Sequence, residues 1–277
     1  MLKSLVNDVL GYFDLLIVRK SDQARLKQTN SYRKKVLSYV PWSHYWAILP
    51  KDESDFIAPY LGYSRAQLGQ DLFALNETRG SSGRKFFVEF GATNGVTQSN
   101  TWLLEKILGW DGIVAEPAQI WHKALKENRS CSIDTRCVST RTGDRIAFLE
   151  VANIKSKSSA ELSSVRSYAD NGDAASALRL ENSREYLVET VSLNDLLQSH
   201  GAPQVIDYMS VDTEGSELDI LGSFDFEKYK VRVISVEHNY RPDYRRAIFE
   251  LLSSKGFVRK YCDVSRFDDW YVAAVSV

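Results

Sequence analysis

The sequence has few cysteines, and this absence limits the kind of protein it encodes. Its 277 residues include only Cys131, Cys137 and Cys262, which form neither metal-spaced pairs nor an even disulfide set. We therefore expect reduced, mostly buried thiols in a cytoplasmic protein. A chain of this length buries roughly 70–75% of its unfolded surface, so it needs no disulfide to be stable.

Long hydrophobic runs are also missing. Asp8 and Asp14 interrupt the N-terminal apolar stretch, which argues against a signal peptide, and the stretch is too short to cross a bilayer. Its apolar residues recur at helical spacing and predict an amphipathic helix: Leu2, Leu5, Val6, Val9, Leu10 and Phe13. We expect this helix to pack on the protein or on a second subunit as a homodimer contact. Peripheral membrane attachment is the alternative, and Lys3, Arg19 and Lys20 support it only weakly.

An excess of charge of one sign is absent as well. The chain has 35 Lys and Arg residues against 36 Asp and Glu residues, a net charge of −1, and no run rich in Lys and Arg. Nucleic-acid-binding proteins usually present a basic face, so we expect no nucleic-acid partner. The dinucleotide fingerprint G-x-G-x-x-G is missing too, which argues against an NAD-dependent oxidoreductase.

What is present divides the chain in two. Residues 1–66 have the pattern of helices and loops punctuated by prolines, which predicts a helical N-terminal extension. In residues 67–277 short apolar strands alternate with helices, as in a parallel, doubly wound sheet. The predicted strands are 85–90, 111–116, 131–138, 145–151, 205–212, 230–237, 257–264 and 270–276, and the predicted helices between the first of them are 101–108 and 120–127.

The last two strands are separated by a loop too short for a crossover, so they must pair antiparallel. The predicted fold class is therefore α/β and Rossmann-like, with a mostly parallel seven-stranded sheet that closes in a C-terminal antiparallel hairpin.

The first strand runs into a glycine-rich turn. In FFVEFGATNG, Glu89 closes the apolar run, and Gly91 and Gly95 follow it. Ligands of such sheets bind beyond the carboxyl ends of the strands, and glycine lets the backbone bend and approach them. A carboxylate at this point disfavours a phosphate and favours a cationic group. S-adenosylmethionine (SAM) carries an ammonium and a sulfonium, so the turn favours SAM.

The next two strands offer further cofactor contacts. GIVAEP places Glu116 and Pro117 at the end of the second strand, where a carboxylate accepts hydrogen bonds from ribose hydroxyls. At the third strand, Asp134 and the backbone around Val138 and Ser139 lie where an adenine edge is expected. A ribose-binding acid without a phosphate cradle indicates a nucleoside that lacks a pyrophosphate.

Two later strands also end in polar side chains. MSVDTEG delivers Asp212 and Glu214, and VISVEHN delivers Glu237, His238 and Asn239 to the same edge of the sheet. Two mechanisms fit. In one, Asp212, Glu237 and Asn239 hold Mg²⁺, which binds a substrate hydroxyl and lowers its pKa. In the other, His238 or a carboxylate is the general base and no metal is needed.

These motifs together resemble one known family. FVEFGATNGVTQSNTWLLEKILGWDGIVAEP, VSLNDLL, IDYMSVDTEGSELDIL and VISVEHNY are similar to the FkbM family of SAM-dependent methyltransferases. The resemblance implies a Rossmann-like fold and O-methylation of hydroxyls, often on sugars or natural products. Gln70 and Asp71, in AQLGQDLF, match a further family motif without an assigned role.

The resemblance and the strand-end positions together define the predicted site. The catalytic candidates are Asp212, Glu214 and His238. The resemblance implies that Ser99 and Asn100 help to hold the methionine end of the cofactor. The full cofactor-binding set is Glu89, Gly91, Ala92, Asn94, Gly95, Ser99, Asn100, Glu116, Pro117, Val138, Ser139 and Asp212.

Residues 152–189 are rich in Ser, Ala, Lys and Arg and lack strand periodicity. They predict a lid or substrate loop, in which Arg166 and Tyr168 would meet an acidic or sugar substrate, or else a mobile solvated loop. We expect an O-methyltransferase acting on a sugar, glycolipid or other small hydroxylated metabolite. The alternatives are an inactive SAM-binding or interaction module and a methyltransferase that acts on nucleic acid.

Overall fold

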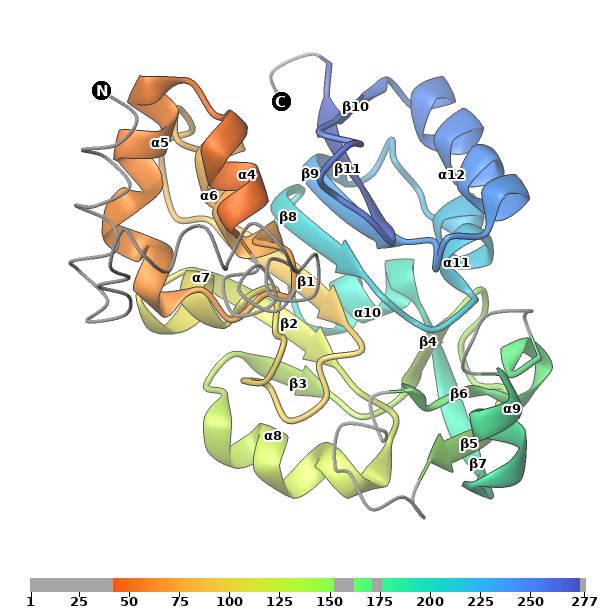
Figure 1. Cartoon of the computed structure of the whole chain (residues 1–277). Coiled ribbons are helices and arrows are strands. Elements are labelled where there is room, and N and C mark those ends of the chain that lie inside the picture. Colours follow the sequence, from red (N-terminus) through yellow and green to blue (C-terminus); the bar gives the residue numbers. More distant parts are fainter. Residues whose placement is uncertain (1–41, 152–161, 171–175, 275–277) are drawn as a thin grey trace, which may run out of the picture.

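The computed structural model describes residues 42–151, 162–170 and 176–274, and a seven-stranded sheet lies at its centre (Figure 1). From edge to edge the strands are β10 (Phe257–Lys260), β11 (Asp268–Ala273), β9 (Lys230–Glu237), β8 (Val205–Val211), β1 (Phe86–Phe90), β2 (Asp111–Ala115) and β3 (Ser132–Asp134). Strand β11 is antiparallel to both neighbours, and all other pairings are parallel. The predicted Rossmann-like sheet with its C-terminal hairpin is therefore confirmed.

Helices cover both faces of this sheet because its strands are apolar on both sides. One face carries α10 (Leu193–Ser199), α11 (Glu217–Ser223) and α12 (Pro242–Ser254). The other carries α6 (Gln70–Glu77), α7 (Trp102–Lys106) and α8 (His122–Asn128), the last preceded by η2 (Gln119–Trp121). In β1, Val88 belongs to the first core and Phe87 to the second, as strand alternation requires.

Three short helices precede α6: α4 (Ser43–Ile48), α5 (Lys51–Ile57) and η1 (Ala58–Tyr63). They join the core of the main sheet, since Tyr45 packs edge to face on Trp270 at 5.4 Å between ring centroids. The amphipathic helix predicted at residues 2–13, with its membrane or dimer contact, lies outside the described residues. Within the described part of the chain, no helix combines the length and the apolar character that crossing a membrane requires.

A second, four-stranded sheet stands beside the first. Its strands are, in order, β4 (Cys137–Ser139), β7 (Ser183–Ser192), β5 (Arg145–Val151) and β6 (Ser164–Val165), accompanied by η4 (Arg166–Tyr168) and α9 (Ser176–Glu181). Phe148, Val165 and Val188 pack together in its own small core. This sheet lies near the carboxyl ends of the central strands, so it forms one wall of the space described below.

Two sequence predictions need correction here. The single strand expected at 131–138 is broken: β3 joins the main sheet, and β4 joins the second sheet. The break follows Asp134, whose carboxylate accepts hydrogen bonds from the backbone and the guanidinium of Arg136 and so fixes a turn. Within 152–189, the described residues include β7, a ten-residue strand paired with β5 along seven residues, in place of the expected loop.

Gly91 offers the sharpest test of how the strand ends pack. Its φ is +73°, and a Cβ at this position would lie 2.2 Å from the backbone oxygen of Asp212, at the end of β8. Gly91→Ala is therefore expected to lower the free energy of unfolding by about 3 kcal/mol in urea denaturation. Gly80→Ala is the matched control, since Gly80 has an ordinary φ and no atom within 4 Å of the added carbon. Equal stability of the two variants would contradict the close approach.

Candidate active site

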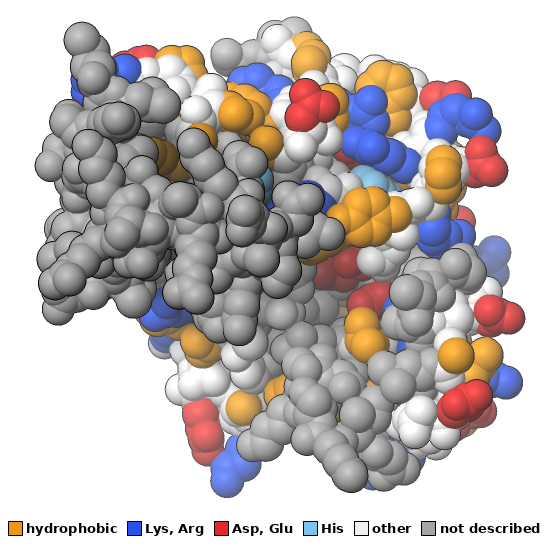
Figure 2. Space-filling model, viewed as in Figure 1, with side chains coloured by type: hydrophobic (Ala, Val, Ile, Leu, Met, Phe, Trp, Pro, Cys, Tyr) orange, Lys and Arg blue, Asp and Glu red, His pale blue; other side chains and the backbone are white. Residues whose placement is uncertain are grey.

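A cavity of about 400 Å³ opens at the carboxyl ends of β1, β2, β8 and β9, between the main and the second sheet. Figure 2 shows acidic side chains in a hollow near the middle of the molecule, viewed from the same side as Figure 1. Ten of the residues predicted from the sequence line it: Gly91, Ala92, Ser99, Glu116, Pro117, Val138, Asp212, Glu214, Glu237 and Asn239. These ten residues therefore share one cavity.

Six other predicted residues do not line the cavity: Glu89, Asn94, Gly95, Asn100, Ser139 and His238. Asn94 shapes the turn after β1, where its Oδ1 accepts hydrogen bonds from the backbone of Val96 and Thr97. Asn100 donates to Ser210 Oγ at 2.9 Å, linking the start of α7 to β8. These residues shape the walls and do not face the space.

Glu89 has a structural role that the sequence did not suggest. Its carboxylate accepts hydrogen bonds from Ser99 Oγ, the Asn100 backbone and Thr101 Oγ1, and it lies 3.3 Å from a guanidinium nitrogen of Arg129. Both side chains are buried, so the acid compensates a buried cation. The expected direct contact of Glu89 with a cofactor is not supported by this placement.

Glu116 lines the cavity at the end of β2. Each carboxylate oxygen accepts one backbone N–H, from Thr93 at 2.8 Å and from Ala118 at 2.8 Å. A carboxylate has about four acceptor positions, so these bonds fix its orientation and leave capacity for two further donors. Burial raises the pKa of Glu116 to about 7.

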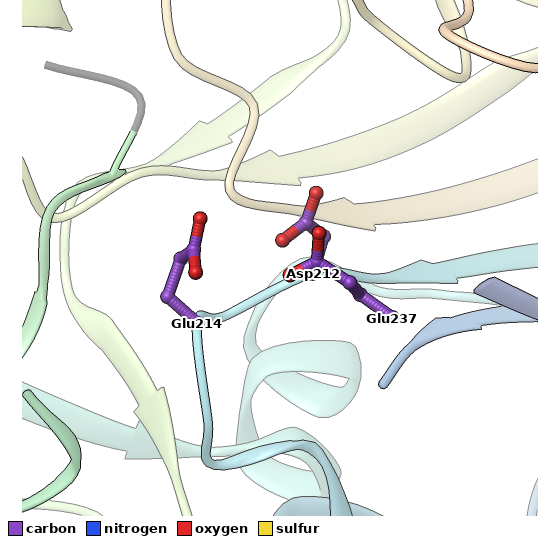
Figure 3. Close-up of side chains that lie close together, drawn as sticks. All are labelled: Asp212, Glu214 and Glu237. Atoms are coloured by element: carbon purple, nitrogen blue, oxygen red, sulfur yellow. The ribbon is translucent and has the colours of Figure 1, made fainter. Parts of the chain in front are cut away.

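Three carboxylates converge at the ends of β8 and β9. Asp212, Glu214 and Glu237 each place a carboxylate oxygen within 4.8 Å of the others (Figure 3). The amide nitrogen of Asn239 donates to Glu237 at 2.7 Å and to Glu214 at 3.2 Å. We call Asp212, Glu214, Glu237 and Asn239 the acidic cluster.

The protonation of this cluster follows from its crowding. Burial and the nearby Asp268 carboxylate raise the pKa of Asp212 to about 7, while a hydrogen bond from Glu237 opposes that rise. Burial and the Asp212 charge raise the pKa of Glu237 well above its ordinary value. Glu237 therefore keeps its proton near neutral pH and donates it to Asp212, because two adjacent carboxylates with little access to solvent resist double ionisation.

His238 is not placed to act as the predicted general base. Its Nδ1 accepts the backbone N–H of Tyr240 at 3.1 Å, and its Nε2 lies 3.1 Å from the backbone oxygen of Asp268, to which it donates. The ring is only 2% exposed, and burial lowers its pKa. Both nitrogens are thus occupied by backbone groups in the neutral ring, and none is left for a substrate.

The comparisons with known proteins decide the family. Residues 89–263 match the model of the methyltransferase FkbM domain, which covers more than half of the chain. The chain belongs to the FkbM methyltransferase family. This confirms the resemblance and shows a methyltransferase domain that contains every residue of the acidic cluster.

Two solved structures are similar to this chain. The methyltransferase FkbM of Methylobacillus flagellatus aligns with 98% of this chain and 70% of its own, at 11% identity and a TM-score of 0.41. A proposed RNA methyltransferase from Pyrococcus horikoshii aligns with 76% of this chain and 86% of its own, at 15% identity and a TM-score of 0.36. The chain matches no curated protein.

One wall of the cavity in this FkbM domain was not predicted from the sequence. The second sheet and α9 contribute Phe148, Val165 and Arg179, and the buried guanidinium of Arg179 forms an ion pair with Glu214. Arg179 lies in the segment expected to be a loop, so its positive charge was the only sequence feature that could have indicated a role in the site. Arg166 and Tyr168, the expected substrate contacts, do not line the cavity and lie near Glu185 and Asp219 instead.

Proposed function

We propose that this protein is a SAM-dependent O-methyltransferase that acts on a hydroxyl of a sugar, glycolipid or other small hydroxylated metabolite. One observation supports this most: a single cavity of an FkbM domain joins an oriented carboxylate, Glu116, to the acidic cluster. The first suits a ribose and the second suits activation of a hydroxyl.

The lining residues fit a nucleoside cofactor. Glu116, at the end of β2, has acceptor capacity for two ribose hydroxyls. Val138 and Phe148 supply apolar surface beside it, suited to a flat base. Gly91 and Ala92 offer backbone on the side of β1, where the methionine end would lie. SAM supplies a methyl group on a positively charged sulfur.

Asp212 is the group proposed to accept the hydroxyl proton. It is ionised when Glu237 holds the shared proton, and it lines the cavity. When bound SAM methylates the acceptor oxygen, Asp212 would take the proton that the hydroxyl releases. A base with a pKa near the working pH suits this transfer. Glu237 hydrogen-bonds to Asp212, and Asn239 in turn holds Glu237 in place.

A divalent cation is the second candidate for the same step. Asp212, Glu214 and Glu237 are hard oxygen donors of the kind that Mg²⁺ binds. Among the described residues, the one positive side chain that lines the cavity is Arg179, and it pairs with Glu214. The donor set therefore fits Mg²⁺. The ion would supply Lewis-acid activation of the acceptor oxygen, and Asn239 would orient the carboxylates.

Calorimetric titration tests the proposal. We expect micromolar binding of SAM to the purified full chain and no binding of NAD, each measured with Mg²⁺ and with EDTA. SAM binding that is indifferent to EDTA, followed by EDTA-sensitive methyl transfer, would assign the ion to the acceptor step. The absence of SAM binding under every condition would overturn the enzyme and favour an interaction module.

A further inference from the structure

The turn that follows β9 has an unusual backbone. Asn239 and Tyr240 are adjacent and both have positive φ, 49° and 56°. Residues with side chains pay a conformational cost in this region, and such a cost persists only where the surroundings hold it in place. The turn lies at the mouth of the cavity, and both residues line it.

His238 and the loop before β11 supply that restraint. His238 Nδ1 accepts the Tyr240 N–H, and the His238 carbonyl accepts the Arg241 N–H at 2.9 Å. The carbonyl of Phe267 accepts the backbone N–H of His238 at 2.8 Å and that of Asn239 at 3.2 Å. The buried imidazole and its partners therefore fix both residues of the turn.

The result is an aromatic ring held out at the cavity mouth. Tyr240 is 66% exposed, yet its ring packs edge to face against Phe267, at 6.3 Å between centroids. A single exposed aromatic needs no explanation by itself. One that is fixed by two loops, beside Asn239 of the acidic cluster, is preorganised to bind a ring.

Amide groups also line this cavity. Gln67 Nε2 donates to Gln98 Oε1 at 2.6 Å, and both side chains line the cavity. Gln98 pairs with Ala66 in an isolated bridge, which anchors the segment before α6 to the turn after β1. Exposed amides offer donors and acceptors for neighbouring hydroxyls, whereas the acidic cluster repels anions.

We propose that Tyr240 is the acceptor-positioning residue of this site. Its ring stacks on the C–H face of a neutral, polyhydroxylated ring of the pyranose type and brings one hydroxyl of that ring to the acidic cluster. His238 is a positioning residue that holds the Tyr240 turn. This inference rests on the proposed methyltransferase function and deepens it, because it names the side chain that selects the acceptor.

Saturation-transfer NMR on the full chain tests the inference. The probes are a panel of methyl glycopyranosides, with catechol as a flat comparator, each added in the presence of S-adenosylhomocysteine. We expect transfer to the ring C–H protons of at least one pyranoside in the wild-type protein. Tyr240→Ala is expected to weaken that pyranoside's binding about tenfold, equivalent to about 1.4 kcal/mol, and Tyr240→Phe to keep it.

Two controls distinguish a failure of this inference from a failure of the proposed methyltransferase function. Tyr63→Ala removes another exposed tyrosine, 47% exposed and outside the cavity lining, and should change nothing. SAM affinity, measured by calorimetry, should be equal in Tyr240→Ala and wild type. If SAM binds but no pyranoside does, if catechol alone binds, or if Tyr240→Ala retains full pyranoside binding, the inference is overturned. If SAM itself does not bind, the proposed function fails first.

Discussion

Asp212→Asn is expected to reduce kcat for methyl transfer by about 10²–10⁴-fold, the usual contribution of a general base. The amide has nearly the shape of the carboxylate and still occupies the cavity lining, but it cannot accept the hydroxyl proton. Radiolabel transfer from SAM to the acceptor measures the loss. Asp219→Asn is the matched control, since Asp219 is exposed, lies in the first turn of α11 and does not line the cavity.

The same substitution is expected to stabilise the fold at alkaline pH. The pKa of Asp212 is raised from 3.8 to about 7, so between these values the folded state binds more protons than the unfolded state. The contribution of Asp212 to stability is therefore fully present below its unfolded pKa and is lost as pH rises through its folded pKa. Asp212→Asn removes this loss, and we expect a gain of about 1–2 kcal/mol at pH 8 in urea denaturation. Unchanged or lower stability at pH 8 would contradict the crowded-carboxylate interpretation.

The pH profile distinguishes the two candidate mechanisms. If Asp212 is the base, kcat/KM rises with pH and levels off above about 7, the pKa of that carboxyl. If a divalent cation occupies the acidic cluster, its charge lowers those pKa values. The acid limb then moves to lower pH, and EDTA abolishes the activity. A profile that follows neither pattern would remove Asp212 from the proton transfer.

The sequence predicted the strand ends well for a physical reason. Apolar runs that stop at Glu116, Asp212 and Glu237 mark where a buried strand reaches solvent, and parallel strands bring such ends to one edge. The direction in which each side chain points was harder to predict from the sequence. Glu89 precedes Gly91 by two residues, yet its carboxylate turns to Arg129, forty residues along the chain. No local pattern reveals that partner.

Tertiary pairing explains the remaining errors. His238 was predicted to be a base because it lies between Glu237 and Asn239 in the sequence. Its Nε2 instead donates to the backbone oxygen of Asp268, thirty residues later. The second sheet depends on the pairing of Cys137 with Thr190, 53 residues apart. In β7 the side chains that face the small core include Tyr186 and Val188. They alternate with polar residues over too few positions to predict a strand. Such strands form through their partners more than through their own composition.

Glu116→Gln is expected to weaken SAM binding by roughly 10²-fold, or about 3 kcal/mol for two hydrogen bonds to a charged group. The backbone N–H groups of Thr93 and Ala118 bond to different carboxylate oxygens, so Gln, with one oxygen, keeps one of these two anchors and turns its NH2 group toward the other N–H. What it loses is charge and acceptor capacity on the side of the ribose. Calorimetry of both proteins with SAM measures the difference.

The pH dependence of this affinity is a second signature of Glu116. Its pKa is raised to about 7 by burial, and the ionised form is the better acceptor for ribose hydroxyls. Wild-type affinity for SAM should therefore fall as pH decreases from 8 to 6, whereas that of Glu116→Gln should change less. An equal pH dependence in both proteins would assign the titration to another group.

Glu89→Gln is expected to have the opposite phenotype, and this contrast separates a cofactor contact from a structural ion pair. Removing the Glu89 charge leaves the buried Arg129 with Glu105 as its remaining carboxylate partner, and we expect a loss of about 3 kcal/mol in the free energy of unfolding. SAM affinity of the folded fraction should stay near that of the wild type, because Glu89 does not line the cavity. If Glu89→Gln keeps its stability but loses SAM binding, the direct contact expected from the sequence is correct, and the carboxylate must turn towards the cofactor when it binds.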